Sequence, residues 1–415
     1  MNKSTILVVI GLFLLSCNQK GTSNKEPEKE ISAVADSLTL ALQKIQKEGQ
    51  INGFGVAIVD KDTVLYENGI GYADLDNEVA YTQNTLQNIA SISKTFIGIA
   101  LLKAQEMGKL KLDDPIQKHL PFTVENPFFP EKPITIRHLA THTSTIVDTD
   151  VYDEESYILK TERDSVNAKS IEIPENFNAP EKKTSMSDFL QSVLSENGKW
   201  YSKEGFLDKK PGELFEYTNV GATLAALIIE NATGEKFNEF TTKYILKPLE
   251  MNASGWSFDA IDVSMHSKLY KTPTTELPLY SLITYPDGGF ITSSHDMNTY
   301  LIELINGYSE NGTVLTNESY KELFTKQLDA NHFTERNEEN PYNDEYNSGI
   351  FMGFSAKGYV GHTGGDPGVS TFMFFDSKKK IGRVLLINTD LNNKEGVEQF
   401  FSIWDTLEEY QEKLN

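Results

Sequence analysis

The stretch Asn88–Phe96 reads NIASISKTF and places Ser91 three residues before Lys94, at the start of an amphipathic run that predicts a helix. Positions i and i+3 of a helix share a face, so the lysine amine can approach the serine hydroxyl. The start of a helix also offers unpaired N–H groups and a positive dipole end, which favour developing negative charge. Ser91 is therefore a candidate nucleophile. The alternative is that Ser91 or Ser93 caps the helix, a common use of serine.

The S-x-x-K pattern is a weak signal by itself. It occurs again at Ser377 and Lys380, within DSKKK between two strand-like runs, where a turn explains every residue. Other motifs are needed to decide between a nucleophile and a helix cap.

A second motif, Y-x-N, also occurs twice. Tyr66 stands at a strand end that enters a turn, whereas Tyr217 and Asn219 lie in PGELFEYTNVGATLAALIIE, a loop leading into an apolar helix. A tyrosine beside Lys94 could serve as a phenolate base or proton shuttle if the cation lowered its pKa. The alternative is a half-buried aromatic residue, with Asn219 capping the helix.

A third motif, H-T-G, occurs once, as His362-Thr363-Gly364, and is followed by Gly365-Asp-Pro-Gly. It stands at the end of a strand-like run, and its glycines would let a substrate approach the backbone closely. A plain edge strand with a tight turn would also fit this pattern.

Composition and charge restrict the class of protein. The 415 residues contain 39% apolar and 24% charged side chains, which is typical of a soluble globular chain. The net charge of −22 argues against nucleic acid as a partner, because phosphate backbones require concentrated lysine and arginine.

Two alternative catalytic signatures are not supported. His138 and His142 are four residues apart, but HLATH lacks the glutamate of the H-E-x-x-H zinc motif. The G-x-S-x-G elbow of α/β-hydrolases does not occur either. We therefore expect no metal ion and no cofactor.

The N-terminal segment indicates export. Lys3 precedes the apolar run Ile6–Leu15, which is too short to span a membrane but suits a signal peptide. The run leads into LLSC, whose Cys17 is the only cysteine of the chain, and this pattern resembles a bacterial lipoprotein signal. We expect residues 1–17 to be the signal, Cys17 to be lipidated, and residues 18–30 to form a flexible tether. The alternative is an ordinary secretory signal with a chance cysteine.

Strand-like runs near both ends of the chain enclose a mostly helical middle, an arrangement that predicts an α+β fold. Strands near both chain ends can share one antiparallel sheet only if the mostly helical middle, about residues 89–285, forms an inserted subdomain. A cleft between the two parts is the expected place for a site. The expected elements are a helix at 31–48, a hairpin of 53–60 and 62–74, an irregular surface excursion at 145–185, strands at 358–364, 370–376 and 380–390, and a final helix at 395–413.

The three motifs together resemble the serine beta-lactamase and penicillin-binding-protein superfamily. They look most like its class C beta-lactamase-related branch, which also holds D-Ala-D-Ala carboxypeptidases, D-aminopeptidases and esterases. The resemblance covers about residues 35–395 and implies one catalytic domain within residues 31–415. Further segments echo the family at 134–144, 211–234, 246–255 and 288–301.

The resemblance assigns chemical roles to the three motifs. Ser91 would attack a carbonyl and form an acyl-enzyme, and Lys94 and Tyr217 would share the role of general base. Asn219 would hydrogen-bond Lys94 or the substrate amide. The remaining roles are an oxyanion hole formed by the backbone N–H groups of Ser91 and Gly365, and a substrate-facing strand formed by His362, Thr363 and Gly364.

Two residues depart from the family pattern. His362 stands where most beta-lactamases have lysine, and a neutral imidazole attracts a substrate carboxylate less strongly than an ammonium does. Histidine at this position favours peptidase-like or esterase-like activity. Thr145 follows HTS where family members usually have glycine, and we expect a structural role for that position.

The sequence therefore predicts an envelope lipoprotein, periplasmic or in the outer membrane, that is a serine hydrolase acting on an amide or ester. Expected substrates are D-amino-acid peptides, peptidoglycan fragments or small esters, and only the lipid would contact the membrane. The alternatives are a beta-lactamase proper, or a non-catalytic penicillin-recognising sensor. We expect specificity to depend on residues 145–200 and 328–347, and the sequence leaves the oligomeric state open.

Overall fold

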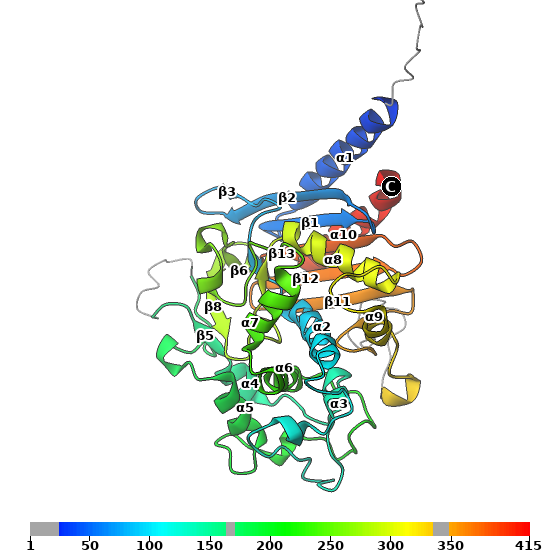
Figure 1. Ribbon diagram of the computed structural model, residues 1–415. Helices are drawn as coiled ribbons and strands as arrows, with labels where there is room; N and C mark the ends of the chain where they lie inside the picture. The colour runs from blue at the N-terminus through cyan, green and yellow to red at the C-terminus, as the bar shows by residue number, and fades with distance from the viewer. Residues whose placement is uncertain (1–24, 163–170, 335–347) are drawn as a thin grey trace, which may run out of the picture.

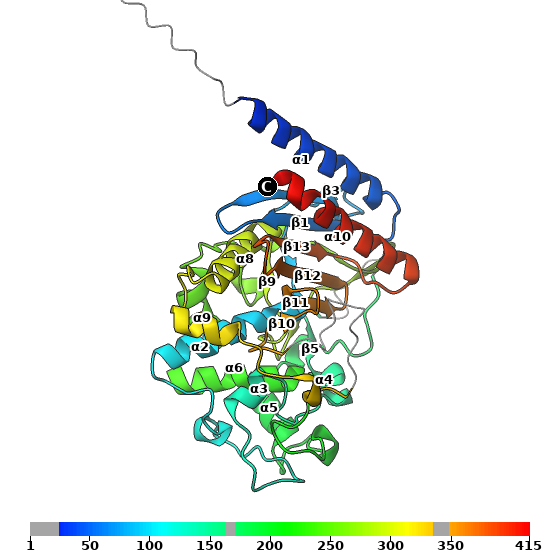
Figure 2. The ribbon, with the colours of Figure 1, turned by 90° about the vertical axis from the view of Figure 1, so that its right-hand side faces the viewer.

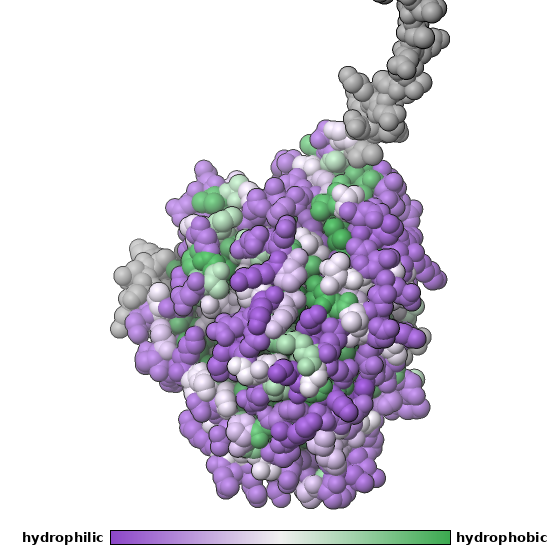
Figure 3. All heavy atoms as spheres, viewed as in Figure 1, coloured by the Kyte–Doolittle hydropathy of each residue, from purple (hydrophilic) through white to green (hydrophobic). Residues whose placement is uncertain are grey.

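The computed structural model describes residues 25–162, 171–334 and 348–415 (Figure 1). The expected signal peptide, Cys17 and the first part of the expected tether lie outside these ranges, as does most of the 328–347 segment. Within them, no helix combines the length and the apolar character that crossing a membrane requires. The face shown in Figure 3 is mainly hydrophilic.

A seven-stranded antiparallel sheet forms the centre of the fold, in the order β10-β11-β12-β13-β1-β2-β3. Strand β1 pairs with β2 on one side and with β13 on the other, where Phe54 faces Ile387. Residues from both ends of the chain thus share one sheet, which confirms the predicted α+β fold. The strands are β1 Gly53–Val59, β2 Val64–Asp74, β3 Val79–Ala80, β10 Gly353–Phe354, β11 Tyr359–Asp366, β12 Val369–Asp376 and β13 Gly382–Ile387.

Helices cover both faces of this sheet. Successive side chains of a strand point to opposite faces, so Phe54, Val56 and Ile58 of β1 pack with α1 (Lys25–Gln46) and α10 (Lys394–Leu414). Ala57 and Val59 belong to the core on the other face, which includes α8 (Ser294–Tyr308). Figure 2 shows α1 and α10 side by side on the outer face of the sheet. Because α1 begins at Lys25, residues 25–30 are helical and do not belong to a flexible tether.

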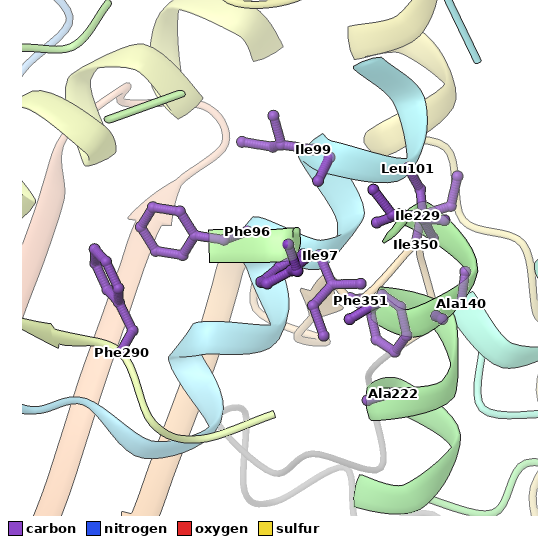
Figure 4. Close-up of a cluster of buried hydrophobic side chains, with 14 of the residues drawn as sticks. Phe96, Ile97, Ile99, Leu101, Ala140, Ala222, Ile229, Phe290, Ile350 and Phe351 are labelled. Atoms are coloured by element: carbon purple, nitrogen blue, oxygen red, sulfur yellow. The ribbon is translucent and has the colours of Figure 1, made fainter. Parts of the chain in front are cut away.

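The middle of the chain forms the predicted helical part, below the sheet in Figure 1. Its two central helices, α2 (Ser93–Glu106) and α6 (Asn219–Thr233), pack against each other through the buried cluster drawn in Figure 4. The other helices of this part are α3 Ile136–Ala140, α4 Asp150–Glu155, α5 Met186–Leu194 and α7 Phe237–Thr241, whereas α9 Asn317–Leu323 follows α8 later in the chain. Three small two-stranded sheets complete it, formed by β4 Gln87–Asn88 with β9 Ile291–Thr292, β5 Tyr157–Leu159 with β8 Tyr280–Leu282, and β6 Leu269–Thr272 with β7 Thr275–Leu277.

The stretch 145–185 is not the surface excursion that its composition predicted. Tyr157 and Phe177 are buried, and their rings stack at 5.5 Å, with Tyr280 of β8 beside Phe177 at 4.8 Å. Few but well-placed aromatic residues therefore dock this acidic segment onto the fold. Residues 163–170 of the same stretch lie outside the described ranges.

Candidate active site

Ser91 lies in a 3-10 turn, Ala90–Ile92, directly before α2. Ala90 has φ = +49°, a backbone conformation that is uncommon for residues other than glycine and is often found at functional sites. The helix-cap interpretation is wrong, because Ile92 is the N-cap of α2 and makes no side-chain cap bond. The hydroxyl of Ser93 instead accepts a hydrogen bond from the N–H of Phe290, at 3.2 Å.

Lys94 extends from the first turn of α2 and is completely buried. Its ammonium donates hydrogen bonds to Ser91 Oγ at 2.9 Å, to Asn219 Oδ1 at 2.7 Å and to the backbone oxygen of Asp287 at 2.8 Å. Oxygens from three separate segments therefore fix the amine beside the serine hydroxyl. The bond to Lys94 is one of the two roles that the resemblance assigned to Asn219.

Tyr217 lies on the other side of the same amine. The Nζ atom of Lys94 is 5.1 Å from the centroid of the tyrosine ring, within the range of a cation–π contact. The ring also lies 6.3 Å from the imidazole of His362. Thr218 is the N-cap of α6, so Asn219 does not cap this helix and its side chain is available to Lys94. The three motifs thus meet at one point of the fold.

His142 supports Tyr217 and was missed by sequence reasoning. Its imidazole is completely buried and stacks on the tyrosine ring, with centroids 4.5 Å apart. Its Nδ1 accepts the N–H of Thr218 at 3.2 Å, which places the proton of a neutral ring on Nε2. Burial, and then the nearby Lys94 and His362, hold the pKa of His142 well below its usual value, so the ring is neutral.

His142, the second histidine of HLATH, thus has a packing role. His138 faces elsewhere, where its Nδ1 accepts the N–H of Thr135. Across residues 25–162, 171–334 and 348–415, no group of three or more His, Cys, Asp or Glu side chains is arranged to hold a metal ion.

Asp148 is a second residue that sequence reasoning missed. Its carboxylate accepts bonds from the Thr218 hydroxyl at 2.7 Å and from the N–H groups of Asn219 and Val220 at 2.7 and 3.0 Å. A carboxylate at the N-terminus of a helix is favoured by the unpaired N–H groups and the dipole there. Asp148 therefore anchors the Y-x-N motif. Its partners are about 70 residues away in the sequence, so no local pattern indicated this role.

Thr145, the departure from the family's glycine, has φ = +72°. This is the left-handed region, which a glycine adopts without strain. The threonine hydroxyl accepts a hydrogen bond from Asn126 Nδ2 at 2.8 Å, within the buried interior. The position is structural, as expected, and Asn126 helps to hold the unusual conformation.

The third motif lies on β11, which runs beside the serine turn. A Cβ on Gly364 would lie 2.5 Å from the backbone oxygen of Ile89, so only glycine permits this approach. His362 is buried, and its Nδ1 lies 2.6 Å from the backbone oxygen of Thr363, which requires the proton on Nδ1. Substrate contacts of His362, Thr363 and Gly364 stay predictions, because these residues do not line the cavity described next.

A cavity of about 350 Å³ opens at Ser91, between the end of β11 and the helical part. It is lined by Ser91, Tyr152, Asp153, Tyr157, Tyr217, Asn219, Asp287, Gly288, Gly365 and Asp366. A larger hollow of about 700 Å³ lies among residues 121–130 and 191–203 and contains none of the three motifs.

The cavity is acidic. Asp287 is completely buried and accepts bonds from the hydroxyls of Tyr152 at 3.0 Å and Thr223 at 2.9 Å. Burial raises the pKa of Asp287 to about 6, although the Lys94 charge opposes the shift. The Tyr157 hydroxyl donates to Asp366 at 2.9 Å. Burial, followed by the charge of Asp287, raises the pKa of Asp366 to about 7.

This antiparallel sheet with a helical insert, and the Ser91–Lys94 pair at their junction, define the serine beta-lactamase and penicillin-binding-protein superfamily. The model of the Beta-lactamase family matches residues 38–408, and the chain belongs to that family.

Known relatives agree with this placement. The chain is 28% identical over 357 residues to the protein named flp of Staphylococcus aureus strain MW2, covering 84% of this chain but only 62% of flp. A penicillin-binding protein homologue from Pyrococcus abyssi superposes with a TM-score of 0.66 at 22% identity, covering 91% of this chain and 76% of that one. D-amino acid amidase from Ochrobactrum anthropi gives 0.63 at 18% identity, covering 91% and 99%.

Proposed function

We propose that this protein is a serine hydrolase that cleaves an amide or ester bond through an acyl-enzyme on Ser91. The observation that carries the proposal is the 2.9 Å hydrogen bond between Lys94 Nζ and Ser91 Oγ, the serine that lines the cavity. A serine hydroxyl becomes an effective nucleophile when a neighbouring base can accept its proton.

The residues then act in two stages. Ser91 Oγ attacks the carbonyl carbon while its proton passes to the Lys94–Tyr217 pair, either to a Tyr217 phenolate beside the Lys94 ammonium or to Lys94 as a neutral amine. The backbone N–H groups of Ser91 and Gly365 bind the oxyanion. The proton returns to the leaving amine or alcohol as the scissile bond breaks. Water then attacks the acyl-enzyme and gives a proton to the same pair, which passes it to Ser91 Oγ as the ester bond breaks. The acid is released and the Ser91 hydroxyl is restored. Asn219 holds the Lys94 amine throughout, by its bond at 2.7 Å.

Probe labelling tests this proposal. A fluorophosphonate and a fluorescent penicillin are each incubated with the protein and with Ser91→Ala, and the adduct is located by peptide mass mapping. Labelling of Ser91 that is lost in the variant supports the hydrolase. If neither probe reacts with Ser91, the chain is a binding or sensor protein of the same fold.

Substrate panels separate the possible activities. Nitrocefin, p-nitrophenyl acetate and D-Ala-D-Ala peptides report a beta-lactamase, an esterase and a carboxypeptidase respectively. We expect nitrocefin to be a poor substrate, because His362 stands where a lysine would attract the carboxylate. Rapid nitrocefin turnover would instead favour a beta-lactamase proper.

We also propose that a lipid on Cys17 anchors the chain in a bacterial envelope. The sequence of the N-terminal segment supports this, as does the position of α1, which leaves the sheet on the side away from the helical part (Figures 1 and 2). Metabolic labelling with an alkyne-tagged fatty acid tests the proposal, since Cys17→Ala should abolish both the label and membrane association.

A further inference from the structure

The carboxylate of Asp366 stands directly beside the reaction centre. It follows Gly365, whose N–H is expected to bind the oxyanion, and it lines the same cavity as Ser91. The point that a Cβ on Gly288 would occupy lies 2.8 Å from Asp366 Oδ2 and 3.8 Å from the Cα of Ala90. Asp366 Oδ2 therefore lies at most 6.6 Å from the Cα of Ala90, in the turn that holds the nucleophile.

One oxygen of this carboxylate is available to a ligand. Oδ1 accepts the Tyr157 hydroxyl at 2.9 Å. Within the described ranges of the chain no hydrogen bond reaches Oδ2, which faces the gap beside Gly288. A half-buried carboxylate oxygen with an unused acceptor position, in a cavity shared with a nucleophile, is suited to bind a donor of the substrate.

The charges that line the cavity indicate that the hydrogen-bond donor of the substrate is a cation. Three carboxylates line it, those of Asp153, Asp287 and Asp366, and its described lining contains no lysine or arginine. The ammonium of Lys94 lies beneath Ser91 and already donates to three protein oxygens. The field inside the cavity therefore attracts a cation and repels a carboxylate.

We propose that the cavity selects substrates that carry a free amine on the carbon next to the scissile carbonyl, with Asp366 Oδ2 as the acceptor for the ammonium group. This inference rests on the proposed hydrolase function and names its substrate class: amino-acid amides, amino-acid esters and short peptides with a free N-terminus. Anionic β-lactams and peptides whose negative charge must enter the cavity are disfavoured by the same field.

The preference depends on pH. Asp366, with its pKa of about 7, is only partly ionised at neutral pH. Binding of an amine should strengthen as pH rises through 7 and weaken as the α-amine loses its proton near pH 8. The titratable and charged groups that interact with Asp366 from neighbouring elements are Lys94, Tyr152, Tyr157, Tyr280, Asp287 and Asp390.

Paired substrates test the proposal. Alanine p-nitroanilide, in D and L forms, is compared with the N-acetyl derivatives, which lack the charge. We expect kcat/KM for the free amine of the better enantiomer to exceed that of its N-acetyl derivative by roughly tenfold to hundredfold, the size of one charge-assisted hydrogen bond. An equal or reversed ratio would overturn the proposal.

Substitutions test whether Asp366 is responsible for the preference for a free amine. Asp366→Asn should reduce the ratio to near one, mainly through the free-amine substrate. Gly288→Ala keeps the carboxylate but adds a Cβ at the point 2.8 Å from Oδ2, so it should lower the ratio as well. Asp259→Asn, which changes an exposed carboxylate that is not part of the cavity lining, is the control and should leave the ratio unchanged. A ratio unaffected by Asp366→Asn contradicts the assignment.

Fluorophosphonate labelling of Ser91, measured alongside the kinetics, tests the hydrolase function separately from the amine preference. If Ser91 is labelled and p-nitrophenyl acetate is hydrolysed but the amine gives no advantage, the amine preference is wrong and the hydrolase stands. If Ser91 is not labelled, both are wrong.

Discussion

The imidazole of His142 lies against the phenol ring of Tyr217, with the ring centroids 4.5 Å apart and the planes inclined by 26°. This contact joins two segments that are distant in sequence, the loop after α3 and the loop before α6. The same imidazole accepts the N–H of Thr218. One buried side chain therefore fixes both the ring and the backbone of the Y-x-N motif.

His142→Ala should both destabilise the protein and slow acylation of Ser91. Removal of a buried ring costs about 3–5 kcal/mol, and the Thr218 N–H loses its acceptor. His142→Asn keeps an acceptor and tolerates the φ of +54°, so it should recover part of the stability but not the stacking. Chemical unfolding and the rate of fluorophosphonate labelling measure the two effects. Labelling of folded His142→Ala at the wild-type rate would contradict the positioning role.

Asp148→Ala should lower activity as well as stability. Three donors at the start of α6 lose their acceptor, which costs about 2–3 kcal/mol, and Asn219 is one of the residues released. Asn393→Ala is the matched control, because Asn393 caps α10 on the outer face of the sheet. Its loss should reduce the unfolding free energy without changing kcat/KM. Similar activity losses in both variants would argue against a specific role for Asp148.

Lys94→Met should abolish most of the reactivity of Ser91. The substitution keeps an apolar stem of similar length but removes the amine, so the rate of acylation should fall by about a hundredfold to ten-thousandfold. Lys380→Met, in the second S-x-x-K sequence, should react at the wild-type rate, since that lysine bonds the backbone oxygen of Ser377 in a turn. Stopped-flow or gel-based labelling rates provide the comparison. A fully reactive Lys94→Met protein would leave Tyr217 as the base.

Asp287→Asn should change how stability depends on pH. The folded-state pKa of about 6 exceeds the usual value of 3.8, so Asp287 favours the folded state fully below pH 4, and this contribution is lost as pH rises through 6. The loss amounts to about 3 kcal/mol. The unfolding free energy of the wild type, measured by urea titration relative to the variant, should therefore fall between pH 4 and pH 8. An increase over this range would show that the buried carboxylate is stabilised in its charged form.

Much of the fold could be predicted from local patterns. Alternating apolar residues indicated the β1–β2 hairpin and the C-terminal strands, and the helices at both ends followed from their apolar spacing. The pairing of β1 with β13 agrees with the expectation that the strands near the two ends of the chain share one sheet. The stretch 145–185 was misjudged because its acidic composition concealed the few aromatic residues, such as Tyr157 and Phe177, that bury it.

The site was predictable only where chemistry follows short motifs. The bonds from Lys94 to Ser91 and Asn219 join residues that the motifs singled out. The roles of Asp148 and Asp366 were not predicted, because they arise from partners that the fold brings near, although Asp366 directly follows the third motif. A carboxylate that caps a distant helix or lines a cavity looks the same in the sequence as a carboxylate in solvent.

The position of β1 between β2 and β13 also affects the order in which the sheet can assemble during folding. Its partner β13 follows it by more than 320 residues, so one edge of β1 stays unpaired until that much more of the chain has been synthesised. Pairings between such distant residues are slow, and an open edge is a template for aggregation. The topology therefore delays completion of the sheet until β13 is available, and the unpaired edge of β1 is exposed to other chains until then.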